Sequence, residues 1–555
     1  MFKTFRLSMT WVHTWFGLVL GFVLMACFFF GSLSVYDREI DRWAIPASRF
    51  APQPMPSFDK MLEPAFRTIK LDAAAREHAQ ERSKSPLPQE LPLHEWGAYT
   101  THRDPVLQMW SGFEIPDPKD PDDDHAYGTL TLDPRTGTPL PETALKIGSQ
   151  FFYPMHYGLH LHWMDLGYWI VGLAALAMLA ALVTGVVMHR KIFRELFTFR
   201  PKKHTQRSAL DLHNLTGVVA LPFHFMFALS GLIIFAGIYF PVSSTLLKPQ
   251  AQAFQKLEAT RSGLPEHPAG IAAPMLSVDA MVAEARRRWA ARGMAGEVGF
   301  LGIHHVGDAN ATVSIYRAGT DRVTLTGEGI HFNGTTGAVI REDEPVSAVR
   351  GINDFITGLH LQHFRHWMLR ALYFAGGLAG CVCIATGFIF FVEKRKRQHV
   401  KQGKGGARWV DALAVTTVTG MLCATVAMLV GNRLLPVDLP MRGDWEERIF
   451  WGAWLVALAH AVWRTSPVLA ARIAPAWREQ CCALALLCVT AVLLNWVTTG
   501  DHLVRTLAAQ YWPVAGVDLV LLGSAGLALI AARRLAGRER NAPAQSGMAK
   551  AVAHG

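Results

Sequence analysis

Four histidines of this 555-residue chain form two pairs with nearly the same sequence surroundings. His13 and His213 each lie four residues before a glycine, and His160 and His360 each follow Gly-Leu. Because an imidazole is costly in hydrocarbon, histidines in apolar segments are candidates for function. Two opposed neutral imidazoles are the axial ligands of a six-coordinate haem iron, whereas zinc needs a third or fourth nitrogen, oxygen or sulfur ligand. The two pairs therefore indicate two bis-histidine haem irons.

Other histidines leave alternatives open. His156 lies four residues before His160 and shares its helical face, so either residue could be the outer ligand. His224 lies 11 residues after His213, nearly on the same helical face, and could ligate a haem as well. The residue at the equivalent distance after His13 is Leu24, which is not a ligand. No residue is assigned a catalytic role. Secondary candidates for an interfacial, haem-propionate or substrate contact are His189, His363 and His366.

These equivalences belong to an internal repeat with an offset of about 200 residues. The motif His-x-x-x-Gly at His13 recurs at His213, Asp133 matches Asn333, and a Thr-Gly pair occurs at 184–185 and again at 386–387. Each copy reads as a helix, an outer polar segment and a second helix. The repeat predicts two parallel copies related by an axis along the membrane normal.

Composition places the chain in a membrane, since 51% of its residues are hydrophobic and 18% are charged, against about 25% charged in soluble domains. A bilayer core needs about 20 apolar residues per helix. Eight stretches qualify, near 12–35, 166–189, 213–240, 370–392, 410–431, 448–466, 481–499 and 513–532. The first run is too long for a cleaved signal peptide, so we expect a retained helix.

Basic residues set the expected topology. They cluster in 190–207, in 394–404 and in the C-terminal tail, which predicts that these segments and both termini are cytoplasmic. This distribution also explains the net charge of +10 without nucleic acid. All seven cysteines lie in apolar segments, so no disulfide framework or thiolate metal site is expected in the polar segments, which would face the periplasm of a bacterial inner membrane.

The expected fold class is a mainly α, integral-membrane helical bundle that carries small α+β periplasmic domains. Turns at 128–137 and 329–337 predict β-hairpins, and residues 277–292 predict an amphipathic helix. The expected organisation is helix 1–36, periplasmic domain 37–150, helix 151–190, basic loop 191–210, helix 211–240, periplasmic domain 241–350, helix 351–393, basic loop 394–409, four further helices in 410–533 and a cytoplasmic tail 534–555.

The motifs His13-Thr-Trp-Phe-Gly, Leu212-His213-Asn-Leu-Thr-Gly, Met155-His156-Tyr-Gly-Leu-His160 and Gly358-Leu-His360, with the two Thr-Gly helix ends, resemble the PepSY-associated transmembrane-helix family over roughly residues 5–397. The resemblance implies an inner-membrane protein linked to iron uptake. Some members are haem-containing ferrisiderophore reductases, which implies two b-type haems that carry electrons to periplasmic Fe(III)-siderophore and release Fe(II). The implied ligands are His13 and His213 for the inner haem, and His360 with His160 or His156 for the outer haem.

The electron donor would be membrane quinol or a cytoplasmic reductase, because the sequence contains no strand-linked Gly-x-Gly-x-x-Gly for a flavin or nicotinamide. The four C-terminal helices depart from the four-helix members. Few polar residues stand out in them, and a structural or quinone-side role is open. Two other functions compete with the reductase: a non-enzymatic regulator or scaffold whose outer domains bind peptides, and a transporter component. The second would show charged residues at mid-membrane, and no convincing one is visible.

Overall fold

The computed structural model describes residues 4–100, 103–120, 123–141, 144–188, 200, 205–319, 321–324, 328–344, 346–402, 406–465 and 474–540. The chain folds into two compact units. We call Met1–Pro46, Thr143–Phe235 and Met368–Gly555 the helical unit, and Ala47–Glu142 with Ala236–Trp367 the sheet unit. Both outer polar segments predicted from the sequence therefore contribute to the sheet unit.

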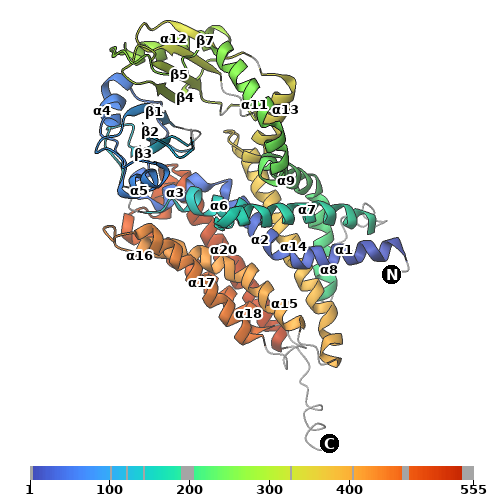
Figure 1. Cartoon of the computed structure of the whole chain (residues 1–555). Coiled ribbons are helices and arrows are strands. Elements are labelled where there is room, and N and C mark those ends of the chain that lie inside the picture. Colours follow the sequence, from blue (N-terminus) through green and yellow to red (C-terminus); the bar gives the residue numbers. More distant parts are fainter. Residues whose placement is uncertain are drawn as a thin grey trace, which may run out of the picture. The chain divides into compact units, whose positions relative to one another are not determined.

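The helical unit is made of helices (Figure 1). Its helices are α1 (Phe5–Val19), α2 (Gly21–Ser34), α3 (Asp37–Ala44), η3 (Ile147–Phe152), α6 (Tyr153–Tyr157), η4 (Trp163–Asp165), α7 (Leu166–Met188), α8 (Thr205–Val219), α9 (Leu221–Ile234), α14 (Trp367–Lys401), α15 (Gly406–Val415), η5 (Thr416–Gly420), α16 (Met421–Leu434), α17 (Arg442–Arg464), α18 (Pro475–Thr499), α19 (Leu503–Ala508) and α20 (Trp512–Arg540). Together they make the chain mainly helical.

The described residues contain five helices that are long and apolar enough to span a membrane, or seven spans if each of two bent helix pairs is one. The sequence predicts eight. The difference is α17, which overlaps the sixth predicted stretch but begins earlier, at Arg442. Its first two turns carry Asp444, Glu446, Glu447 and Arg448, so the helix is too highly charged to qualify by composition.

Two predicted spans are bent at equivalent places. The axes of α1 and α2 meet at 60° around Leu20, and those of α8 and α9 meet at 64° around Ala220. Pro222 explains the second bend, because proline lacks the N–H that would continue the hydrogen-bond ladder. His13 and His213 lie on the first helix of their respective bent pairs.

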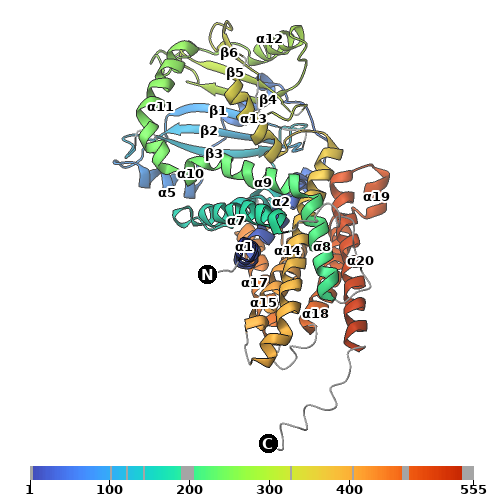
Figure 2. The same ribbon diagram turned by 90° about the vertical axis from the view of Figure 1, so that its right-hand side faces the viewer.

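The sheet unit contains one seven-stranded antiparallel sheet (Figure 2). Its strands are β1 (Leu93–Tyr99), β2 (Leu107–Glu114), β3 (His125–Leu132), β4 (Val298–His304), β5 (Thr312–Arg317), β6 (Gly329–Asn333) and β7 (Val339–Glu342), in the order β3-β2-β1-β4-β5-β6-β7. The prediction of two separate small domains is corrected by this sheet. Pairing of β1 with β4 joins the two polar segments, because an unpaired strand edge leaves backbone N–H and C=O groups without partners.

Apolar side chains fix the sheet to its covering helices. Trp96 of β1 stacks on Phe66 of α4 (Glu63–Phe66), with ring centres 5.2 Å apart, and Trp289 of α12 (Val278–Ala291) is fully buried in the same core. The predicted helix at 277–292 is thus confirmed, and Ser277 caps its N-terminus. Of the hairpins predicted at 128–137 and 329–337, the second is confirmed as β6 and β7, whereas the first is a turn closed by an isolated bridge between Leu132 and Pro139. Each turn ends in a glycine with positive φ, Gly137 and Gly337. The remaining helices of this unit include α5 (Ala73–Arg82), α11 (Pro241–Ser262) and α13 (Ala348–Leu361).

Buried polar contacts fasten the C-terminal helices to earlier parts of the helical unit. The indole Nε1 of Trp43 on α3 donates to Asp518 on α20 at 2.8 Å. Glu446 on α17 is fully buried and accepts from the side-chain amide of Asn432 at 2.7 Å and from the backbone N–H of Leu145 at 2.9 Å. These carboxylates are absent from the sequence-based prediction, which treats the last four helices as nearly apolar. Burying such carboxylates without hydrogen-bond partners would be costly. Because both find partners in earlier parts of the chain, the C-terminal helices pack as part of the helical unit.

Candidate functional site

His13 is held by the helix α7 opposite. Its Nδ1 lies 2.9 Å from the carbonyl oxygen of Ala181 and 3.2 Å from the hydroxyl of Thr184, which itself donates to the Ala181 carbonyl at 3.1 Å. The next residue, Gly185, lies beneath the ring, since a Cβ there would be 3.4 Å from a carbon atom of the His13 ring. The first Thr-Gly pair therefore positions an imidazole.

His213 is held in the same way by α14. Its Nδ1 lies 2.8 Å from the carbonyl oxygen of Cys383, which also accepts from the Thr386 hydroxyl at 3.0 Å. A Cβ at Gly387 would lie 3.3 Å from the His213 ring. Both Thr-Gly pairs thus supply a carbonyl acceptor three residues before the threonine and a glycine under the ring.

His13 and His213 are neighbours in the helical unit, with ring centres 6.1 Å apart and ring planes at 85°. A metal–imidazole nitrogen bond is about 2 Å long, so two imidazoles on one iron have ring centres about 6 Å apart. A histidine that binds a metal usually directs its other ring nitrogen to a carbonyl or carboxylate. Both residues do so through Nδ1, which leaves Nε2 available to a metal ion. The pair fits a bis-histidine haem.

His156 repeats this construction a third time. Its Nδ1 lies 2.8 Å from the carbonyl oxygen of Cys27 on α2, and a Cβ at Gly31, four residues further on, would lie 2.7 Å from the same nitrogen. In all three cases the acceptor carbonyl lies four residues before the glycine. One helical turn separates these positions, so the carbonyl and the glycine lie on one face. The three histidines are therefore presented by one structural arrangement.

His160 is placed differently. It lies in the turn after α6 with a φ of +52°, and its Nε2 lies 3.0 Å from the carbonyl oxygen of Phe151. Its ring stacks on that of Phe151, with centres 4.5 Å apart. Of the two candidates that the sequence leaves open, the geometry favours His156 as a haem ligand.

The other candidates are spread over both units. His224 is fully buried on α9, its ring 5.2 Å from that of Phe28, and Nδ1 has no hydrogen-bond partner among the described residues. His360 lies on α13 of the sheet unit, and His363 and His366 follow this helix. His189 lies outside the described residues, as do 190–199 and 201–204 of the basic segment.

Sequence reasoning misses the carbonyl acceptors, because backbone groups carry no residue signature. It also misses a cluster of histidines and carboxylates on the sheet, in which His94 of β1 and His304 of β4 come together. The positions of the two Thr-Gly pairs are the sequence signal that could have located the carbonyl acceptors.

Replacing Gly167 by alanine is expected to destabilise the protein by about 3 kcal/mol, the cost of forcing extra volume into a packed site. A Cβ there would lie 1.8 Å from the carbonyl oxygen of Gly158, in the tight connection between α6 and α7. Two backbone hydrogen bonds through Leu161, at 2.9 and 3.0 Å, hold the connection closed. Thermal unfolding in detergent, followed by tryptophan fluorescence, measures the effect.

The matched control for this substitution is Gly452→Ala on α17, where a Cβ would meet nothing within 4 Å. Alanine favours helix over glycine, so this variant should unfold at the wild-type temperature or above it. Equal unfolding temperatures for Gly167→Ala and the wild-type protein would contradict the close backbone approach.

The fold and the site define a class: a multi-pass helical membrane protein with histidines presented between its helices and an antiparallel sheet built from its polar segments. The family model of the PepSY-associated TM region matches residues 10–394, and the chain belongs to this family. The chain is also similar to the uncharacterized protein PA4219 of Pseudomonas aeruginosa strain PAO1, with 27% identity over 307 residues, which cover 52% of this chain and 73% of that protein. The family match includes His13, His156, His213 and His360 and ends before α15.

Proposed function

We propose that this protein is an inner-membrane, b-type haem protein that carries electrons across the membrane and reduces Fe(III)-siderophore in the periplasm, so that Fe(II) is released. The observation that supports it most is the pair His13 and His213, 6.1 Å apart between ring centres, with both Nδ1 atoms directed at backbone carbonyls. The family supports a membrane location, and the bends at Leu20 and Ala220 support equivalent roles for the two halves.

His13 and His213 would hold the inner haem. His156 would hold the outer haem, and His360 remains a candidate ligand on the sequence equivalence alone. Bound haem supplies a one-electron Fe(III)/Fe(II) couple. The chain's own part is to fix each imidazole: the Nδ1–H donates to a carbonyl oxygen, which sets the tautomer and leaves the Nε2 lone pair pointing away from the supporting helix. The glycine beneath the ring lets it lie close to that helix.

The remaining parts of the proposal rest on the sequence. Basic segments favour cytoplasmic termini, and electrons would come from quinol or a cytoplasmic reductase. Membrane lipid surrounds the helical unit, and nucleic acid is not a partner. The C-terminal helices are fastened to α3 through Asp518, which favours a structural role for them.

One experiment tests both cofactor and activity. Protein purified in detergent should give a b-type α-band after reduction and about two haems per chain by pyridine haemochrome assay, as two histidine pairs require. After removal of the reductant, a soluble ferric siderophore should reoxidise the haem, with about one ferrozine-trapped Fe(II) for each electron lost. Protein without haem, despite adequate haem supply, would favour the scaffold function. Haem that stays reduced in the presence of the ferric siderophore would overturn the reductase.

A further inference from the structure

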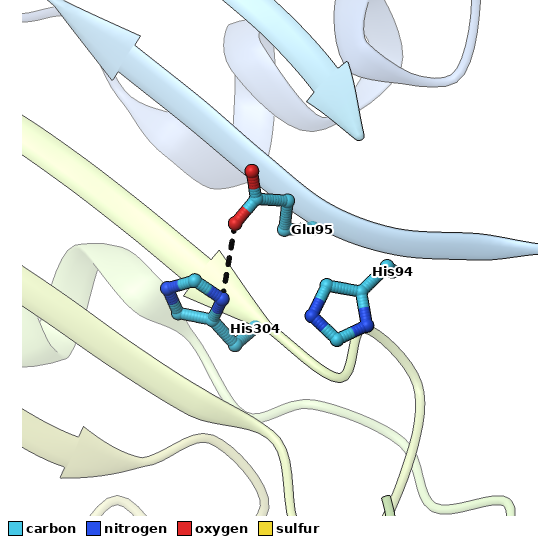
Figure 3. Close-up of side chains that lie close together, drawn as sticks. All are labelled: His94, Glu95 and His304. Carbon is cyan, nitrogen blue, oxygen red and sulfur yellow. Dashed lines mark ion pairs between the residues drawn. The ribbon is translucent and has the colours of Figure 1, made fainter. Parts of the chain in front are cut away.

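Four histidines and three carboxylates gather at the N-terminal end of β1 in the sheet unit. Figure 3 shows three of them, His94, Glu95 and His304. Their side chains come from four neighbouring strands, β3, β2, β1 and β4, and from the residues that adjoin β3 and β4. The members of this cluster, which we call the sheet cluster, are His94, Glu95, Glu114, Asp124, His125, His304 and His305. None of them lies in an apolar segment or belongs to the proposed haem sites.

A β-bulge in β1 lets the consecutive residues His94 and Glu95 both take part in the sheet cluster. The pairing with β2 shifts between Leu93 and Glu95, so His94 is the extra residue of the bulge. Consecutive side chains of a regular strand point to opposite faces, and a bulge re-aims one of them. Glu95 lies directly opposite His304 of β4, whose Nδ1 is 3.0 Å from the Glu95 carboxylate. One ligand atom from each of His94, Glu95 and His304 lies within 4.8 Å of the other two.

Room for Glu95 comes from its other cross-strand neighbour. Gly112 of β2 pairs with Glu95, and a Cβ at this glycine would lie 2.6 Å from the Glu95 side chain. The side chains of Glu95 and His94 are mostly buried, with 17% of each exposed, whereas 47% of the His304 side chain is exposed. The cluster is thus partly enclosed by the sheet, with an open side at His304.

A second group adjoins the first through the same histidine. The His94 Nδ1 lies 3.2 Å from Glu114, and the ring of His125 lies 4.4 Å from that of His94 between centres. His305, only 6% exposed, approaches His94 at 5.1 Å, and its Nδ1 has no hydrogen-bond partner among the described residues. A buried imidazole nitrogen without a partner among the described residues is available to a water molecule or to a metal ion.

We propose that His94, Glu95 and His304 bind one divalent transition-metal ion in the sheet unit, with His305 adjacent to it. Two imidazole nitrogens and one carboxylate oxygen suit Fe(II), Ni(II), Cu(II) or Zn(II), and leave positions open for water or a ligand. Calcium and magnesium prefer all-oxygen sites, so they are not expected here. That Fe(II) is the natural occupant rests on the proposed function, because a reductase would release that ion. The proposal that the site binds a metal ion is independent of the proposed function.

Zinc is the probe, because it is redox-inert and binds such ligands tightly. Full-length protein with a non-histidine affinity tag is incubated with ZnCl2, gel-filtered, and analysed for zinc per chain by mass spectrometry; titration calorimetry gives the Kd. The wild-type protein should retain about one zinc more than His94→Gln/His304→Gln. Glu95→Gln should bind zinc at least tenfold more weakly, as expected for loss of a charged ligand.

The matched control is His78→Gln on α5, which removes an exposed histidine that is itself paired with a carboxylate, Glu81, at 3.6 Å. This variant should retain the wild-type zinc content. Unfolding temperatures measured without zinc show whether each variant is folded. If His94→Gln/His304→Gln does not fold, the zinc affinity of Glu95→Gln tests the site instead. Equal zinc content in wild-type protein and a folded cluster variant would overturn the site and assign the cluster to ion pairing alone. The haem count is independent of this outcome.

Discussion

Replacement of His213 by alanine is expected to reduce the haem content from about two to about one per chain. Iron in this site would lose one of its two axial imidazoles, and alanine leaves no nitrogen to replace it. Because His13 faces His213 with ring centres 6.1 Å apart, His13→Ala should remove the same haem. The double variant His13→Ala/His213→Ala should therefore also retain about one haem. This non-additivity is the signature of two residues that act on one group.

Pyridine haemochrome counts and the reduced visible spectrum measure these losses. His460→Ala is the matched control, since His460 is a half-buried histidine of the same unit whose Nε2 is paired with Glu479 at 2.9 Å. This variant should keep about two haems. Retention of both haems by folded His213→Ala would remove the residue from the ligand set. Loss of both by the double variant alone would show that the two histidines serve different haems.

His156→Ala and His160→Ala are expected to differ sharply. The first should lose the second haem, leaving about one per chain, and the second should keep about two. His156 shares the arrangement of His13 and His213, with Nδ1 on the carbonyl of Cys27 and Gly31 beside the ring. The His160 Nε2 is instead directed at the Phe151 carbonyl. The same haemochrome assay separates the two variants.

A combination with the inner site sharpens this test. His156→Ala/His213→Ala should contain almost no haem, because each substitution removes a different one. The opposite ranking, with haem lost in His160→Ala and kept in His156→Ala, would assign the outer ligand to the residue that matches His360 in the sequence. Equal loss in both variants would show that His160 supports the site through the stacked Phe151.

Local patterns account for the features that the sequence predicts well. Apolar length predicts the spanning helices, the Asp and Asn residues followed by glycine predict the turns at 133–137 and 333–337, and Ser277 marks the start of α12. The internal repeat also places His13 and His213 at equivalent positions. These signals lie within a few residues of the feature that they predict, so no knowledge of tertiary contacts is needed.

Long-range partners account for what the sequence does not predict. The choice between His156 and His160 depends on which carbonyl each ring meets, and backbone atoms have no sequence signature. Glu446 and Asp518 are unremarkable acids until Asn432 and Trp43 are seen to bind them. The sheet cluster depends on β1 pairing with β4, whose residues lie about 200 positions apart in the chain.

That pairing has a consequence for biosynthesis. The partner strand β4 is synthesised about 200 residues after β1, behind seven intervening α-helices from α6 to α12, of which α10 is Ala236–Tyr239. At about 5–20 residues per second, translation leaves this strand edge without its partner for roughly 10–40 seconds. During this interval the edge is open to pairing with other nascent chains. The sheet is therefore the part of the molecule for which assistance by a chaperone during synthesis matters most.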